Sequence, residues 1–161
     1  MSGHDHTYRT ELAWSGSTAA GYDAYDRRHR IVAPPAVGAL DLASDPAFRG
    51  DPTRLNPEQL LVAAASSCQL LSFLAVAARA RLDVVAYRDD AVAVMPSGNQ
   101  PMWITRIDLR PMITLASPPP DAGGPTDERL AHLAEVAHRE CFIANSLRTE
   151  ITVTPTFVRE G

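Results

Sequence analysis

The sequence predicts a single α+β domain over residues 1–161, in which a long buried central helix packs against antiparallel sheet. Residues 60–78 form a run of nineteen residues without a charge, long enough for a buried helix. Segments rich in β-branched residues and punctuated by turn residues lie on both sides of this run. A hydrophobic content of 45% with a charged content of 21% is typical of a globular chain.

The N-terminal third of the chain reads as β-hairpins. Residues 8–55 contain short strand-like pieces separated by glycine and proline, among them Gly21, Pro34 and Gly38. Such residues favour tight turns and interrupt longer elements. Residues 1–7 precede the first strand-like piece and are expected to be disordered.

The central helix has a clear start signal at Asn56. Asparagine is a favoured N-cap, and Pro57 suits the first helical position. Gln59, three residues after the cap, can complete a capping box. Glu58 adds negative charge at the positive end of the helix dipole. The helix is therefore expected to run from here to about Arg79.

Two strand candidates and a closing strand follow the helix. Residues 82–95 are rich in β-branched side chains, and residues 97–99 form a turn. Residues 103–116 alternate between apolar and polar side chains, as a half-buried strand does. Residues 150–158 form the last strand candidate.

A second helix is expected to begin at Thr126 and to reach Cys141. Its apolar positions follow a helical spacing: Leu130, Leu133, Ala134 and Ala137. The pair Asn145 and Ser146 then indicates a break before the closing strand.

The uncharged run of residues 60–78 does not read as a membrane span. It has the length of one, but six of its residues are alanine, and Ser66, Ser67 and Gln69 place polar groups at mid-length. A helix that is apolar all round is buried on nearly all sides. Sheet can cover one side and a second subunit the other, so an obligate homodimer is expected.

Composition excludes several function classes. A net charge of −4 argues against binding to nucleic-acid phosphates. All fifteen basic residues are arginine, which excludes Schiff-base lysine chemistry and a Walker-type phosphate loop. Two cysteines 73 positions apart do not make the disulfide scaffold of a secreted protein. Because no export signal is seen either, a reducing cytoplasmic location is expected.

The two cysteines admit more than one interpretation. Cys68 in its apolar run can be a small buried hydrophobe, which is how free cysteine usually behaves, or a reactive thiol supported by a nearby cation. The basic segment 25–30, YDRRHR, offers such cations, although most charge runs are simply solvated. Zinc is an alternative through His138 and Cys141, three residues apart, but no CxxC or HExxH motif completes a site. No GxSxG motif for a serine hydrolase is present.

Two longer motifs resemble a known family. NPEQLLVAAASSCQLLSFL (56–74) and HRECFIANSL (138–147) are similar to the OsmC/Ohr family of thiol-dependent peroxidases. The YDRRHR segment and residues 49–58 are similar to its OsmC-like branch. In this family a helix beginning Asn-Pro-Glu carries a peroxidatic cysteine ten residues after the glutamate, and a second cysteine follows near the end of the second long helix.

The resemblance implies an intertwined α+β homodimer with active sites at the interface. It also implies reduction of organic hydroperoxides to alcohols, with Cys68 as the peroxidatic thiol and Cys141 as the resolving thiol that forms a disulfide with it. Glu58 would steady an active-site arginine, Arg27, with Arg28 as the alternative. Ten helical residues separate Glu58 from Cys68 by about 15 Å, so Glu58 would act on the partner's cysteine across a two-fold axis.

The resemblance further implies an antioxidant stress-response protein that needs no bound cofactor or metal. Its electrons would come from an external thiol, which in Ohr-type relatives is a dihydrolipoyl group. His29 would neighbour the active-site arginine, and Gln69 departs from many relatives at the position after the first cysteine. The competing hypothesis is a non-catalytic protein that binds a small molecule, or acts in a stress response, on the same scaffold.

Overall fold

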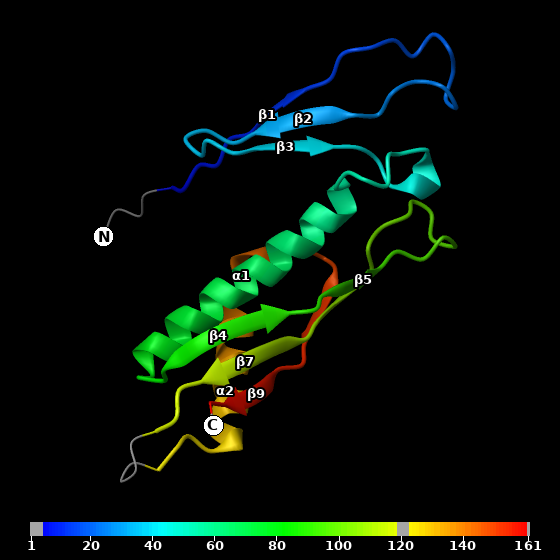
Figure 1. The fold of residues 1–161 in the computed structure, drawn as a ribbon. Coiled ribbons are helices and arrows are strands. Elements are labelled where there is room, and N and C mark those ends of the chain that lie inside the picture. The colour runs from blue at the N-terminus through cyan, green and yellow to red at the C-terminus, as the bar shows by residue number, and fades with distance from the viewer. Residues whose placement is uncertain (1–4, 119–122, 161) are drawn as a thin grey trace. The chain divides into compact units, whose positions relative to one another are not determined.

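The computed structural model describes residues 5–118 and 123–160 (Figure 1). The chain divides into two compact units, residues 1–60 (unit 1) and residues 61–161 (unit 2). Residues 5–7 are exposed and have no regular structure. The rest of the N-terminal segment expected to be disordered, residues 1–4, lies outside the described residues.

Unit 1 is built on a three-stranded antiparallel meander. Its strands are β1 (Glu11–Ala13), β2 (His29–Val32) and β3 (Ala39–Leu42), paired in chain order. A short 3₁₀ helix, η1 (Pro46–Phe48), follows β3. The expected hairpins are therefore confirmed, and the YDRRHR segment (25–30) covers the end of the β1–β2 connection and the first two residues of β2.

Among its described residues, unit 2 contains two three-stranded sheets, ordered β4-β7-β9 and β5-β6-β8. Their strands are β4 (Val84–Asp89), β5 (Val92–Val94), β6 (Arg106–Leu109), β7 (Pro111–Leu115), β8 (Glu150–Val153) and β9 (Thr156–Arg159). The expectation of purely antiparallel sheet is wrong here, because β8 and β9 pair in parallel with β6 and β7. A long helical connection precedes β8, and such crossovers allow parallel pairing.

The three strand candidates of unit 2 each divide into two strands that join different sheets. β4 pairs with β7, whereas β5 pairs with β6. The breaks have local causes. Pro111 and Pro155 lack the N–H that a continuous ladder needs, and the Arg110 N–H is bonded to the side chain of Asp89 at 2.7 Å.

Three α-helices complete the part of the chain that the structure describes: α1 (Pro57–Arg79), α2 (Asp127–Glu140) and α3 (Phe142–Ser146). α1 and α2 match the expected helices. The N-cap of α2 is Thr126, whose side chain accepts the Arg129 N–H. In unit 2, one core cluster joins α1, β7 and α2 around Phe73, and a second joins α1 to β6 around Ile107. The four predicted α2 positions are all buried.

One face of α1 is buried in this single chain. That face carries Ala65, Gln69, Phe73, Val76 and Ala77. Elsewhere on the helix large apolar side chains meet solvent, with Leu71 64% exposed. The helix is thus less covered than the expected central helix, and the second subunit that would cover it remains a prediction.

Candidate functional site

The start of α1 is fixed by the predicted capping box. The Asn56 side-chain oxygen accepts the Gln59 N–H at 2.8 Å, and the Gln59 side-chain oxygen accepts the Asn56 N–H at 3.0 Å. Two N–H groups that the first helical turn leaves without partners are satisfied in this way. The cap fixes the residue at which α1 begins. It therefore also fixes where Glu58 and Cys68 lie along the helix.

Cys141 sits at the junction of α2 and α3 and caps both helices. Its own N–H donates to the His138 carbonyl at 3.2 Å, which closes α2. Its Sγ accepts the Ala144 N–H at 3.5 Å, which opens α3. The chain therefore turns at the cysteine itself, earlier than the break expected at Asn145. The side chain is buried, with 1% of its surface exposed.

The Cys68 thiol lies near the Cys141 thiol. Cys68, on α1, is half-buried, and its Sγ accepts the Ile143 N–H from α3 at 3.4 Å. Burial raises the pKa of Cys141 to about 11, and a hydrogen bond with Cys68 acts in the same direction, although the Ala144 N–H opposes both. Both thiols are free. Two cysteines 73 positions apart in the sequence are thus brought together in unit 2.

A cavity of about 490 Å³ opens beside Cys68. Leu71, Ala75 and Phe142 give it apolar walls, and Phe142 is 80% exposed. At another part of the rim, Arg79 forms an ion pair with Glu140. The half-buried thiol therefore faces space that accepts an apolar group.

Arg27, in unit 1, is held by two tyrosines. Its guanidinium carbon lies 3.9 Å from the centre of the Tyr25 ring and 4.7 Å from that of Tyr22. It also donates to the carbonyl oxygens of both residues. Among the described residues it forms no ion pair. Sequence reasoning missed this arrangement, although the tyrosines of the motif YDAYDRRHR were its available signal.

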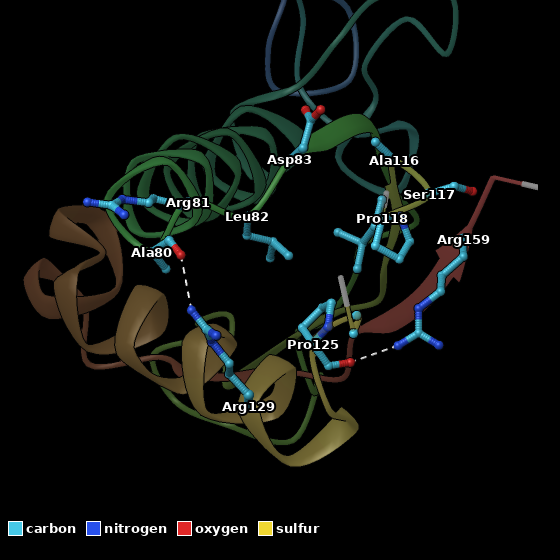
Figure 2. A pocket seen from close by; sticks show the side chains of 13 residues that line it. Ala80, Arg81, Leu82, Asp83, Ala116, Ser117, Pro118, Pro125, Arg129 and Arg159 are labelled. Carbon is cyan, nitrogen blue, oxygen red and sulfur yellow. Dashed lines mark hydrogen bonds between the residues drawn. The ribbon is translucent and has the colours of Figure 1, made fainter. Parts of the chain in front are cut away.

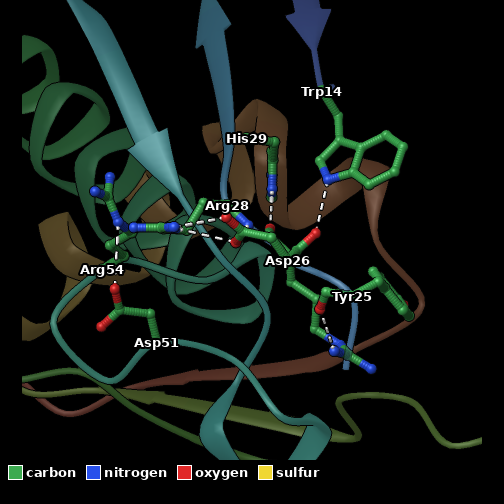
Figure 3. Close-up of polar contacts among 8 residues, drawn as sticks. Trp14, Tyr25, Asp26, Arg28, His29, Asp51 and Arg54 are labelled. Atoms are coloured by element: carbon green, nitrogen blue, oxygen red, sulfur yellow. Dashed lines mark hydrogen bonds and ion pairs between the residues drawn. The ribbon is translucent and has the colours of Figure 1, made fainter. Parts of the chain in front are cut away.

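Arg28, the alternative to Arg27, is paired with a carboxylate (Figure 3). Its Nε and Nη2 donate to both Asp26 oxygens at distances of 2.7 to 3.0 Å. This hydrogen bonding lowers the pKa of Asp26 to about 2. His29 Nδ1 lies 2.9 Å from the Arg27 carbonyl oxygen. Arg27 is thus the arginine of this segment whose charge is not already neutralised by a neighbour.

Glu58 lies in the first turn of α1 and belongs to unit 1. Its Oε2 is buried without a hydrogen-bond partner in the described part of the chain. No ion pair joins it to Arg27 within the described residues of unit 1. The structure therefore brings the two cysteines together, whereas the predicted interaction of Glu58 with an arginine remains a prediction.

Other sites considered from the sequence find no support. Within residues 5–118 and 123–160, no group of three or more His, Cys, Asp or Glu side chains could hold a metal ion.

A separate cavity of about 320 Å³ in unit 2 is bordered by arginines (Figure 2). Arg129 donates to the Ala80 carbonyl at 3.0 Å and Arg159 to the Pro125 carbonyl at 2.8 Å. These side chains tie backbone segments together.

The family profile described as OsmC-like protein matches residues 50–156. The chain belongs to the OsmC-like protein family. No curated protein sequence is significantly similar to it. The match identifies α1, which by length and composition alone could cross a membrane, as a core helix of a soluble OsmC-like protein.

Solved structures share the fold over nearly the whole chain. An OsmC-like protein of unknown function from Vibrio cholerae is 26% identical, with a TM-score of 0.83 over 94% of this chain and 100% of that one. An organic hydroperoxide resistance protein from Elizabethkingia anophelis is 18% identical, with a TM-score of 0.70 over 98% of this chain and 99% of that one. A putative organic hydroperoxide resistance protein from Vibrio cholerae, with captopril bound in one of its active sites, is 22% identical. Its TM-score is 0.66 over 95% of this chain and 93% of that one.

Proposed function

We propose that the protein is a cysteine-based peroxidase that reduces organic hydroperoxides to alcohols. The observation that carries the proposal is the pair of free thiols, one half-buried beside a mainly apolar cavity and the other buried next to it. A structural cysteine needs neither a partner thiol nor a cavity. Family members that are organic hydroperoxide resistance proteins support the same reading.

The reaction begins at Cys68. Its thiolate attacks the distal peroxide oxygen and the O–O bond breaks, which leaves Cys68 as a sulfenic acid. The departing alkoxide takes up the proton that the Cys68 thiol lost on ionisation and leaves as the alcohol. The Ile143 N–H donates to Cys68 Sγ at 3.4 Å and holds the sulfur beside α3. Leu71 and Phe142 would contact the organic part of the substrate.

The cycle continues through Cys141. Its sulfur attacks the sulfenic sulfur, a Cys68–Cys141 disulfide forms, and water leaves, which protects Cys68 from overoxidation. An external dithiol, for which the dihydrolipoyl group of Ohr-type relatives is the precedent, then reduces the disulfide. No bound cofactor takes part in these steps.

Arg27 and Glu58 complete the proposed site. Arg27 would stabilise the thiolate and orient the peroxide, because a guanidinium remains charged at any working pH. Glu58, with its unpartnered oxygen, would hold that arginine. Ten helical residues separate Glu58 from Cys68 by about 15 Å, so the two side chains of one chain do not meet. We therefore propose a homodimer in which Glu58 and Arg27 of one subunit act on the partner's Cys68 thiol. The proposed location is the cytoplasm.

Turnover kinetics test this function. Cumene hydroperoxide and hydrogen peroxide should both be offered with a dithiol reductant, and we expect faster consumption of the organic peroxide. Cys68→Ser should abolish consumption, and Cys141→Ser should permit a first reaction followed by inactivation. Equal rates with and without both thiols would refute the proposal.

The competing function is non-catalytic binding of a small molecule on the same scaffold. The cavity beside Cys68 favours it, as does the small molecule bound in an active site of the Vibrio cholerae relative. This function predicts that unreactive apolar compounds bind equally to wild type and to Cys68→Ser, without any change in thiol content.

A further inference from the structure

The resolution step of the proposed function depends on a break in the helical structure at Cys141. The residue lies between α2 and α3 with extended backbone angles, φ −70° and ψ 110°. The last carbonyl groups of a helix have no partner within that helix. Helical hydrogen bonds therefore do not fix the direction in which the chain leaves α2. The sulfur that must meet Cys68 is carried by a junction that needs other contacts to hold it.

Asn145, in α3, supplies contacts of this kind. Its Nδ2 donates to the Arg139 carbonyl, near the end of α2, and to the Cys141 carbonyl, both at 2.9 Å. Because both partners are acceptors, the amide nitrogen with its two N–H donors must face them. The Asn145 backbone N–H also donates to the Cys141 carbonyl, at 3.1 Å. One residue thus ties the end of α2 to the start of α3 across the cysteine.

The short helix that Asn145 holds in place contacts both sulfur atoms. The Ala144 N–H donates to Cys141 Sγ at 3.5 Å, and the Ile143 N–H donates to Cys68 Sγ at 3.4 Å. Asn145 itself borders the cavity beside Cys68, while its amide bonds go to backbone carbonyls. Its effect on the thiols therefore passes through the backbone: it fixes α3 against α2, and α3 contacts both sulfurs.

We propose that Asn145 is a positioning residue for the resolution step, a role that rests on the proposed peroxidase function. In that step the Cys141 sulfur bonds to the Cys68 sulfur, the S–O bond of the sulfenic acid breaks, and the hydroxyl leaves as water with the proton of the Cys141 thiol. A misplacement of about 1 Å between reacting atoms can cost on the order of 100-fold in rate. The two amide bonds limit the movement of the Cys141 backbone and so keep its sulfur near Cys68.

Ser146 offers a matched control within the same helix. Its hydroxyl donates to the Phe142 carbonyl at 2.7 Å, so it also joins a side chain to the backbone, but entirely within α3. Ser146→Ala therefore removes a comparable hydrogen bond and leaves the bonds of Asn145 to Arg139 and Cys141 in place. A general weakening of α3 would slow resolution in both variants, whereas a loss of positioning would slow it only at Asn145.

Asn145→Leu removes both amide donors with little change in shape and none in charge. The reduced variant would receive one equivalent of cumene hydroperoxide, sulfenic acid would be trapped with dimedone at successive times, and thiols would be counted. We expect sulfenic acid to form at the wild-type rate and to resolve at least about tenfold more slowly. Excess peroxide should then convert more Cys68 to sulfinic acid than in wild type. Should Asn145→Leu fail to fold, Asn145→Ala gives the same comparison without the bulk.

Ser146→Ala should match wild type in both steps, and Asn145→Leu should have no further effect in a Cys141→Ser background. Resolution at the wild-type rate in Asn145→Leu, equal slowing in Ser146→Ala, or a further effect without Cys141 would overturn the positioning role.

Diamide, which joins two thiols without peroxide, separates this inference from the proposed function. If wild type forms no sulfenic acid, the peroxidase proposal fails, and the resolution step fails with it. Slower closure of the Cys68–Cys141 disulfide by diamide in Asn145→Leu than in Ser146→Ala would still show that Asn145 positions Cys141. Equal closure rates in the two variants would remove that role as well.

Discussion

The burial of Cys141 predicts a thiol that ionises only at high pH. With a pKa of about 11, roughly one Cys141 in 1,000 is a thiolate at pH 8, against about one in four for a cysteine of ordinary pKa. Cys141 should therefore never be the first nucleophile, even though it is one of two free thiols. Cys68→Ser isolates this residue and, because burial is the largest cause of the shift, leaves most of the shift in place.

Alkylation with iodoacetamide, followed by mass spectrometry, measures this thiolate fraction. In Cys68→Ser the rate should rise about tenfold per pH unit from pH 7 to pH 10, since the thiolate fraction does so below the pKa. The same variant in denaturant should reach half of its maximal rate near pH 8.5, level off about one pH unit higher, and serve as the reference. A rate in the folded variant that stops rising between pH 9 and pH 10, as the rate in denaturant does, would contradict the assignment of Cys141 as a buried, neutral thiol.

Three further predictions follow from the other contacts. Asn56→Ala removes the cap of α1 and should lower the free energy of unfolding by about 1 kcal/mol, measured by urea denaturation; an unchanged midpoint would contradict the capping role. Arg27→Met should lower peroxidase turnover at least tenfold, whereas Arg28→Met, which removes an arginine already paired with Asp26, should leave turnover within about twofold; the reverse order would identify Arg28 as the active-site arginine. Leu71→Glu places a charge on the exposed apolar side of α1 and should yield monomers in light scattering, so an unchanged dimer mass would place the interface elsewhere.

Local signals predicted α1 and α2 well, whereas α3 was not predicted. The start of α1 follows from Asn56 and Gln59, which bond to each other within one turn, and the start of α2 follows from Thr126 in the same way. Capping depends on neighbours in sequence, so sequence reasoning can find it. The buried positions of α2 also followed from their spacing alone.

The pairing of strands was beyond such reasoning. Residues 82–95 read as one strand, yet Val84–Asp89 and Val92–Val94 pair in different sheets. Partner choice depends on distant segments, and strand propensity is identical for either sheet. The parallel pairs of β8 and β9 follow from the crossover through α2, which the alternation of side chains does not encode.

The candidate site was predicted only in part from the residues themselves. Nothing in a separation of 73 positions implies that Cys68 meets Cys141; the family resemblance supplied that expectation, and the structure places the two thiols near each other. The tyrosine stacking around Arg27 and the bonds of Asn145 across the Cys141 junction depend on side-chain packing in three dimensions. Both were found only in the structure.

The most direct test of the central claim is the mass and thiol content of the reduced protein after one equivalent of cumene hydroperoxide. The account predicts the loss of two thiols and of about two mass units, with a linked peptide pair containing Cys68 and Cys141. Hydrogen peroxide should give the same product more slowly. An unchanged mass with both thiols intact would show that the cysteines are structural and would contradict the account.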